Sequence, residues 1–138
     1  MNVRVKIVDN RLNELSGQLR RLASRAVREE LMAITKDVKM DMAQTKSGGL
    51  YLRSKTGAPH QASAPGEAPA IDSGALVNSI QTTMDGDLSG AVYTNQEYAM
   101  FLEYGTTKMA ARPFFSSNGE KSRPRFWARI NQILGGLK

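Results

Sequence analysis

A long helical pattern in the first third of the chain constrains the fold more than any other feature. Between Asp9 and Thr45 the sequence contains no proline and a single glycine, Gly17. Apolar residues recur there every three or four positions and then shift to a neighbouring line: Leu12, Leu15, Leu19, Leu22, Ala26, Val27, Leu31, Ile34, Val38 and Met42. Such a shift is expected of a 3.6-residue helix that curves over a core. The pattern predicts one long helix, with Asp9 or Asn10 as its N-cap and Gly48-Gly49 as its stop.

The remaining patterned segments are short and of mixed type. Residues 3–7 alternate apolar and basic side chains, which predicts a short edge strand. The later segments predict a turn of helix at 72–80 capped by Asp72 or Ser73, a hairpin across Asp85-Gly86-Asp87, a helix at 97–104 that stops at Gly105, an extended segment at 112–115, and an amphipathic helix from about Arg123-Pro124. This order predicts a single α+β domain over residues 1–138, in which a long N-terminal helix and shorter helices pack on a small antiparallel β-sheet.

Residues 47–71 have a different composition from the rest of the chain. They combine four glycines with three Ala-Pro pairs and few large apolar residues. Each proline fixes its own φ and favours an extended alanine before it, so the segment predicts a protruding Pro/Gly-rich arm. Residues 51–53 and 60–62 are expected to form the two sides of a loose hairpin. Such an arm would reach a neighbouring subunit, and disorder in the free subunit is the alternative.

Charge and composition limit the classes of protein. The 138 residues include no cysteine, which excludes disulfides and thiolate metal sites. The sequence has no apolar run long enough for a membrane span or a signal peptide, so we expect a cytosolic site of synthesis and no membrane partner. The net charge of +6 is confined to residues 108–138, which carry seven basic residues and one acidic residue. Four of these are candidate contacts to DNA, with a solvated surface as the alternative: Lys121, Arg123, Arg125 and Arg129.

The sequence lacks the patterns that indicate catalysis. Its one histidine, His60, lies in the Pro/Gly-rich arm, and neither a nucleophile elbow nor a phosphate-binding loop is present. We therefore expect no enzyme activity, no metal and no cofactor. The spacing of the aromatic residues predicts that most of them are core, with stacking on nucleic acid bases as the alternative. These residues are Tyr98, Phe101, Tyr104, Phe114, Phe115, Phe126 and Trp127.

Two stretches of the chain resemble a known family. Residues 63–80 contain Ala-Pro-Gly-Glu-x-Pro followed by Asp-Ser-Gly-x-Leu-x-x-Ser-Ile, and residues 98–115 contain Tyr-x-x-x-Leu-Glu-Tyr-Gly-Thr followed by Arg-Pro-Phe. In this order and spacing they resemble the tail-component family encoded in the head-to-tail gene block of long-tailed bacteriophages. Its members are called neck, head-tail joining or tail-completion proteins, and the minor tail protein Z of phage lambda is similar to them.

The resemblance implies a structural virion protein that completes the tail or joins it to the head. It implies a homo-oligomer, a six-fold ring around the DNA channel, with other neck, connector and tail proteins as partners, made in the host cytoplasm and then located in the virion. A DNA-binding module that uses the basic C-terminal third is the alternative function. The residues expected at subunit or partner contacts are Tyr51, His60, Pro65, Glu67, Pro69, Glu103, Thr106, Lys108, Arg112 and Phe114. Glu103 and Arg112 are further expected to form an ion pair within or between subunits.

Overall fold

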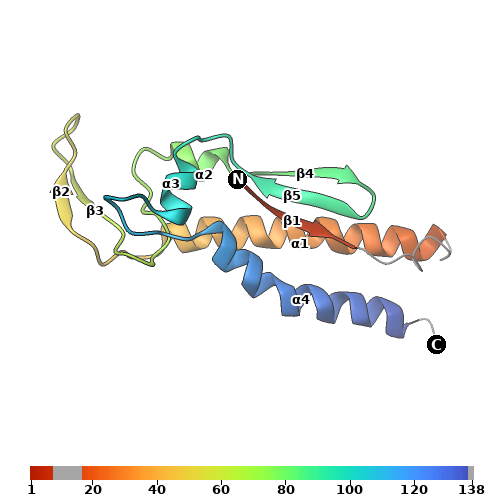
Figure 1. Cartoon of the computed structure of the whole chain (residues 1–138). Coiled ribbons are helices and arrows are strands. Elements are labelled where there is room, and N and C mark those ends of the chain that lie inside the picture. Colours follow the sequence, from red (N-terminus) through yellow and green to blue (C-terminus); the bar gives the residue numbers. More distant parts are fainter. Residues whose placement is uncertain (8–16, 137–138) are drawn as a thin grey trace.

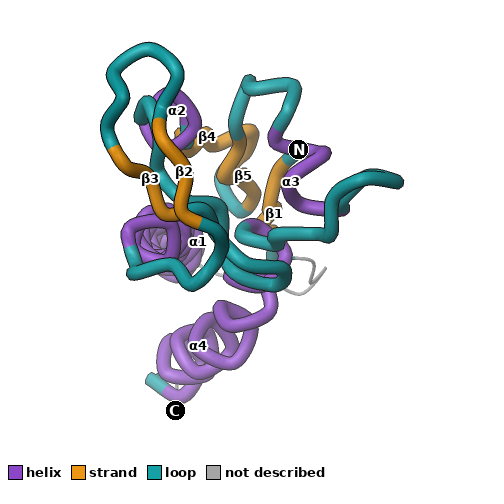
Figure 2. Tube along the Cα trace, turned by 90° about the vertical axis from the view of Figure 1, so that its left-hand side faces the viewer, coloured by secondary structure: helices purple, strands orange, loops and turns teal. Residues whose placement is uncertain are grey.

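The long helix α1 (Gly17–Ala43) is the centre of the fold. In the computed structural model, which describes residues 1–7 and 17–136, a three-stranded sheet lies along one side of α1 and helix α4 (Phe115–Gly135) lies along the other (Figure 1). The view down α1 shows the same arrangement (Figure 2). The α+β class and the long N-terminal helix are therefore confirmed. The predicted N-cap at Asp9 or Asn10 lies outside the described residues, and α1 ends at Ala43, before the two glycines.

The three-stranded sheet is antiparallel and has the order β1-β5-β4. It consists of β1 (Asn2–Lys6), β4 (Gln81–Gly86) and β5 (Ser89–Tyr93), and the last two form the predicted hairpin. Val3 pairs with Val92, and Val5 pairs with Gly90. Because side chains alternate along a strand, this register places Val3, Val5 and Val92 on the face toward α1 and leaves Arg4, opposite Ala91, on the outer face, where it bonds to Asp85.

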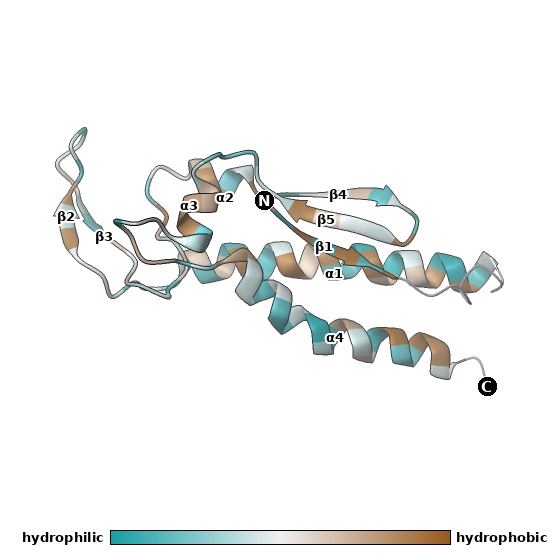
Figure 3. Cartoon of the chain, viewed as in Figure 1, coloured by the Kyte–Doolittle hydropathy of each residue, from teal (hydrophilic) through white to brown (hydrophobic). Residues whose placement is uncertain are grey.

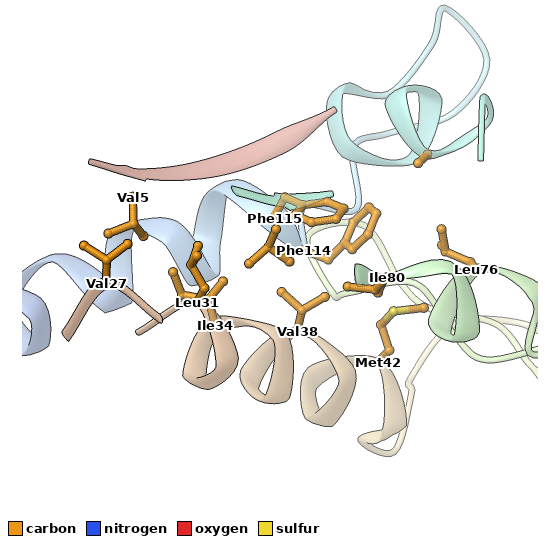
Figure 4. Packing of buried hydrophobic residues seen from close by; sticks show 12 residues of the cluster. Val5, Val27, Leu31, Ile34, Val38, Met42, Leu76, Ile80, Phe114 and Phe115 are labelled. Atoms are coloured by element: carbon orange, nitrogen blue, oxygen red, sulfur yellow. The ribbon is translucent and has the colours of Figure 1, made fainter. Parts of the chain in front are cut away.

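The core lies between α1 and the elements on either side of it. Its buried apolar residues come from every layer, and Figure 4 shows how they interleave: Val5, Val27, Leu31, Ile34, Val38, Met42, Leu76, Ile80, Val92, Ala99, Phe114 and Phe115. The residues from α1 repeat at the spacing that the sequence predicts. Helix α1 thus contributes one continuous apolar stripe to a single core.

Gly90 of β5 marks the closest approach of the sheet to α1. A Cβ atom at this position would lie 2.5 Å from Leu31 Cδ1 and 2.6 Å from the carbonyl oxygen of Thr83. We expect Gly90→Ala to lower the free energy of unfolding by about 1–3 kcal/mol, because the side chain and the strand must both shift to admit a methyl group. Urea unfolding measures this effect. Gly86→Ala is the matched control, since a Cβ there meets nothing within 4 Å, and equal losses in both variants would contradict the packing argument.

The shorter elements lie near the C-terminal end of α1. They are the two-stranded hairpin of β2 (Leu50–Leu52) and β3 (Pro59–Gln61), helix α2 (Ala75–Ser79) and helix α3 (Ala99–Tyr104). The hairpin and α3 were expected from the sequence, and Gly105 ends α3 with φ +76°. The N-cap of α2 is Gly74 and not Asp72 or Ser73, although the hydroxyl of Ser73 accepts the N–H of Ala75, the first residue of α2, at 3.3 Å. Asp72 bonds to Arg53 instead.

Helix α4 begins eight residues before the start predicted at Arg123-Pro124. Pro124 therefore lies inside the helix, where it cannot donate a hydrogen bond to the carbonyl one turn earlier, and Phe115 is helical and not part of an extended segment. Because proline is favoured in the first turn of a helix, the sequence alone places the start of α4 at Pro124, which is wrong. The observed start of α4 is stabilised by the side chain of Glu103, which is distant in the sequence.

Most of the aromatic residues are not core, contrary to the prediction. Phe114 and Phe115 are fully buried and Phe126 is half-buried, whereas the other four are exposed: Tyr98, Phe101, Tyr104 and Trp127. For α3 the reason is that the helix is short: Ala99 and Glu103 are buried, Leu102 packs against the core, and the other positions are exposed. Its aromatic residues lie on faces that no other described element covers.

No helix within residues 1–7 and 17–136 has the length and apolar character that a membrane crossing requires.

Candidate subunit interface

Glu103 at the end of α3 holds the start of α4. Its side chain is only 4% exposed. One carboxylate oxygen accepts the backbone N–H groups of Phe114 at 2.8 Å and Phe115 at 3.0 Å, and the other accepts that of Ser116 at 2.8 Å. These are N–H groups of the first turn of α4, which have no partner within the helix. Glu103 thus caps α4 from a position eleven residues before its N-cap.

The electrostatics of Glu103 follow from these bonds. Burial alone would raise the pKa of the carboxyl group, but the hydrogen bonds from Phe114, Ser116 and Phe115 outweigh it and hold the pKa below its usual range. The ionised form is therefore stabilised, and the negative charge lies at the positive end of the α4 dipole. Within the described chain the expected Glu103–Arg112 ion pair does not form, since the carboxylate serves α4.

Arg112 lies beside α3 with part of its guanidinium group unpaired. Its backbone N–H donates to the carbonyl of Leu102 at 2.6 Å, which fixes the chain against α3. The side chain is half-buried, and its Nη1 atom is buried without a hydrogen-bond acceptor among the described residues. Glu103 and Arg112, expected as partners, therefore have separate roles.

Arg112 lines a groove of about 320 Å³ at the end of the molecule that carries the β2–β3 hairpin. The groove runs between the hairpin, the loop before α2, and α3. Apolar side chains form much of its wall, among them Met42, Ile71, Leu76, Tyr98 and Leu102. The groove is thus mainly apolar, with one partly unsatisfied cation.

The β2–β3 hairpin is tied to the loop before α2 by polar contacts. His60 is 8% exposed, and its ring meets that of Tyr51 edge-on at 5.1 Å. Nη2 of Arg53 lies 2.8 Å from Nδ1 of His60, and Nε of Arg53 bonds to Asp72. A guanidinium group can only donate, so we assign the proton of the neutral imidazole to Nε2. These contacts leave His60 as a structural group within the hairpin.

Glu67 closes the base of the arm. Its carboxylate accepts from the hydroxyl and N–H groups of Ser47 and from the N–H of Ala64 at 2.8 Å. Nearby, the N–H of Gly66 donates to the carbonyl of Ala111 at 3.0 Å. The return half of the Pro/Gly-rich segment is therefore bonded to the body of the protein, and the β2–β3 hairpin is the part that projects (Figure 1).

The bonds to Glu67 predict an unusual titration. The Ser47 hydroxyl contributes most, followed by the N–H groups of Ala64 and Ser47, and together they lower the pKa of Glu67 to about 2. We expect the carboxyl carbon signal of Glu67 in NMR, and the amide signals of Ser47 and Ala64, to titrate together near that pH. Ser47→Ala should move the midpoint toward the ordinary value. A midpoint near 4.5 in the unsubstituted protein would contradict the arrangement.

Large apolar side chains are exposed on α3 and on strand β2. They are Leu50, Tyr51 and Leu52 of β2, Met100, Phe101 and Tyr104 of α3, and Tyr98 at the N-cap of α3. Figure 3 shows brown segments on both elements. Only Tyr51 among them was expected at an interface. The signal that could have identified the others is that α3 carries apolar residues at almost every position, more than one face of a short helix can bury.

The other predicted contact residues divide by burial. Pro65, Thr106 and Lys108 are exposed, and Glu67 and Arg112 are half-buried. Pro69, Phe114 and Glu103 are buried, as is His60. Phe114 in particular is enclosed in the core with Phe115 and offers no surface to a neighbour. For the exposed residues, a role in subunit contacts stays a prediction.

The basic residues of α4 are paired with acidic residues, mainly those of α1. Arg125 bonds to Glu30 and Asp37, Arg129 bonds to Glu29, Lys121 bonds to Asp41 and Arg123 lies 3.6 Å from Glu120. The sequence indicates an excess of positive charge here, but the fold uses much of it to attach α4 to α1. Contact of these residues with DNA stays a prediction. Their ion pairs leave less uncompensated positive charge on α4 than the sequence alone indicates.

The described residues contain no group of three or more His, Asp or Glu side chains that could hold a metal ion. The arrangement of this end of the molecule, with exposed apolar side chains, a groove and a bonded hairpin, is typical of a surface that binds another protein.

Comparison with known proteins assigns the family. A family model described as "Bacteriophage HK97-gp10, putative tail-component" matches residues 7–105, which is more than half of the chain. The chain therefore belongs to the HK97-gp10-like family of bacteriophage tail components. The match includes α1, the β2–β3 hairpin and α3, and ends at Gly105, before Arg112 and α4. Searches of curated proteins and of solved structures gave no match.

Proposed function

We propose that this tail component is a subunit of the head-tail junction of a long-tailed phage. In this role it forms or joins a six-fold ring around the DNA channel and attaches the tail to the head, as part of the virion after assembly in the host cytoplasm. The observation that carries the proposal is the set of large exposed apolar side chains on α3 and on β2, in a chain of a phage tail-component family. Large exposed apolar patches mark protein interfaces.

The geometry favours head-to-tail contacts between copies. These side chains lie at one end of the molecule (Figure 1), and the C-terminal half of α4 carries different exposed apolar residues, Trp127 and Leu134. A contact between two unlike patches generates a closed ring when its rotation closes. DNA binding by α4 is the weaker candidate, because its cations already have acidic partners.

The proposal is tested with purified protein added to tail-less heads and to unfinished tails. We expect particles joined in its presence, and rings in negative-stain images. Phe101→Ser should abolish joining, whereas Met32→Ser should not. The two side chains are almost equally exposed, at 57% and 56%, but only Phe101 is one of the exposed apolar residues of α3 and β2. Protein that joins neither particle, or variants that behave alike, would overturn the proposal. Salt-dependent binding of free duplex DNA would favour the DNA-binding candidate instead.

A further inference from the structure

The groove beside α3 contains a cation that the described chain does not satisfy. Nη1 of Arg112 is buried and has no acceptor among the described residues. A buried donor without a partner is unfavourable, and more so when it carries charge. The hydrogen bond from the Arg112 backbone N–H to the carbonyl of Leu102 fixes the base of this side chain beside the end of α3.

The acidic residues near this groove are already in use. Asp72, which also lines the groove, bonds to Arg53. Glu103 accepts three backbone N–H groups of α4, and Glu67 accepts groups of Ser47 and Ala64. Each of these carboxylates would have to break existing hydrogen bonds to reach Arg112. An acceptor for Arg112 is more readily supplied by another molecule.

The walls of the groove define the rest of the occupant. Met42, Ile71, Leu76 and Leu102 give it an apolar lining, and the exposed Tyr98 stands at its side. An apolar side chain inserted here is removed from water, and a carboxylate next to it can form a charge-assisted hydrogen bond with Arg112 in a partly desolvated site.

We propose that this groove binds a segment of a partner protein subunit in which Asp or Glu lies next to an aliphatic or aromatic residue. The carboxylate pairs with Arg112, and the apolar side chain fills the space between α2 and α3. This inference rests on the proposed function for the identity of the partner as another subunit of the junction. The recognition chemistry rests on the groove alone.

The chemistry is tested on the isolated protein with a small probe, 4-methylpentanoate. Its matched control is 4-methylpentanamide, which has the same shape and no charge. Titrations followed by ¹⁵N NMR of the Arg112 side chain should show saturable shifts with the carboxylate, and at least tenfold weaker binding of the amide. Equal binding of both probes, or no binding of either, would overturn the proposal without any substitution in the protein.

Variants assign the effect to Arg112. Arg112→Gln should weaken binding of 4-methylpentanoate at least tenfold and keep the backbone bond to Leu102. Lys36→Gln is the matched control, because Lys36 is an exposed cation of α1 that does not line the groove and is not among the predicted contact residues. Equal losses of 4-methylpentanoate binding in the two variants would mean that the probe is held by general electrostatic attraction. The proposed site at Arg112 would then be wrong.

The role in docking is tested by joining heads and tails. Arg112→Gln should reduce joining at least tenfold, whereas Lys36→Gln should not. Charge-selective probe binding at Arg112 with undiminished joining would overturn the partner assignment. If the unsubstituted protein joins no particle, the proposed function fails, but selective binding of the carboxylate would still support the groove as a site. The two failures are thus distinguishable.

Discussion

Replacing Glu103 by alanine is expected to lower the free energy of unfolding by about 3 kcal/mol and to loosen α4 first. The substitution removes the acceptor of three N–H groups, two of which belong to the buried residues Phe114 and Phe115. A buried donor left without a partner costs about 1–3 kcal/mol, and the exposed Ser116 can turn to water. Urea unfolding measures the loss, and hydrogen exchange should show faster exchange in the first turns of α4.

Two further variants test whether the loss of stability comes from the capping of α4 by Glu103. Glu97→Ala removes an exposed carboxylate close to the start of α3 and should change stability by less than about 0.5 kcal/mol. Glu103→Gln keeps an acceptor oxygen and loses the charge, so its effect should lie between those of the two alanine variants. The capping role of Glu103 is wrong if Glu103→Ala and Glu97→Ala are equally stable.

The capping bonds also give stability a pH dependence. The pKa of Glu103 is lower in the folded protein than in the unfolded chain, so the unfolded state binds a proton more readily. The stabilisation is complete above the ordinary glutamate pKa of about 4.5 and is lost as the pH falls through the lower folded value. Glu67 acts in the same direction down to about pH 2. Below pH 4.5, unfolding measurements on Glu103→Gln should therefore show a shallower fall than those on the unsubstituted protein.

The parts of the fold that the sequence predicts depend on local patterns. The apolar stripe from Leu19 to Met42 identifies α1, because all of its residues except the exposed Leu22 are buried in the fold. The Asp85-Gly86-Asp87 turn identifies the β4–β5 hairpin, and Gly105 identifies the end of α3 through the positive φ that it adopts. In each case the determinant lies within a few residues of the structure that it specifies.

The parts that the sequence does not predict depend on distant contacts. The start of α4 is stabilised by Glu103, and no rule of local capping looks eleven residues back. The attachment of α4 to α1 joins residues about 80 to 100 positions apart. Charge counts along the sequence therefore identify the excess of positive charge near the C-terminus. They do not identify the acidic residues of α1 that form ion pairs with these basic residues.

The candidate interface was partly hidden for the same reason. Glu103 and Arg112 are predicted from the sequence to pair with each other at a subunit contact. Within the described chain Glu103 accepts N–H groups of α4 instead, and a place for either residue at a subunit contact stays a prediction. Sequence periodicity suggests that an aromatic residue on a helix is core, and this fails where the helix is short and has a single neighbour. Phe101 and Tyr104 are exposed because the second layer that would cover them is absent from the described chain.

The α1–α4 contact supports a second large effect, the loss of stability in Arg125→Met. Glu30 is 0% exposed, and Arg125 contacts its carboxylate at 2.6 and 2.8 Å and that of Asp37 at 2.8 Å. Removing Arg125 leaves the buried charge of Glu30 with Arg129, at 3.8 Å, as its one remaining ion-pair partner within residues 1–7 and 17–136. Breaking one side of a buried ion pair costs about 3–5 kcal/mol, and the partial exposure of Arg125 places the expected loss near about 3 kcal/mol in urea unfolding.

The double variant Glu30→Leu/Arg125→Met distinguishes a buried charge from lost packing. Replacing both partners by apolar side chains removes the unpaired charge, so the double variant should be more stable than Arg125→Met alone, which is a coupling that a double-mutant cycle measures directly. Arg123→Met is the control, since the Arg123–Glu120 pair is exposed on both sides and should contribute less than about 1 kcal/mol. Additive losses at Glu30 and Arg125 would mean that α4 is attached to α1 by packing and not by these charges. The ion pairs with α1 would then not explain the excess of basic residues in the last third of the chain, and an acidic partner outside the chain would again be needed to explain it.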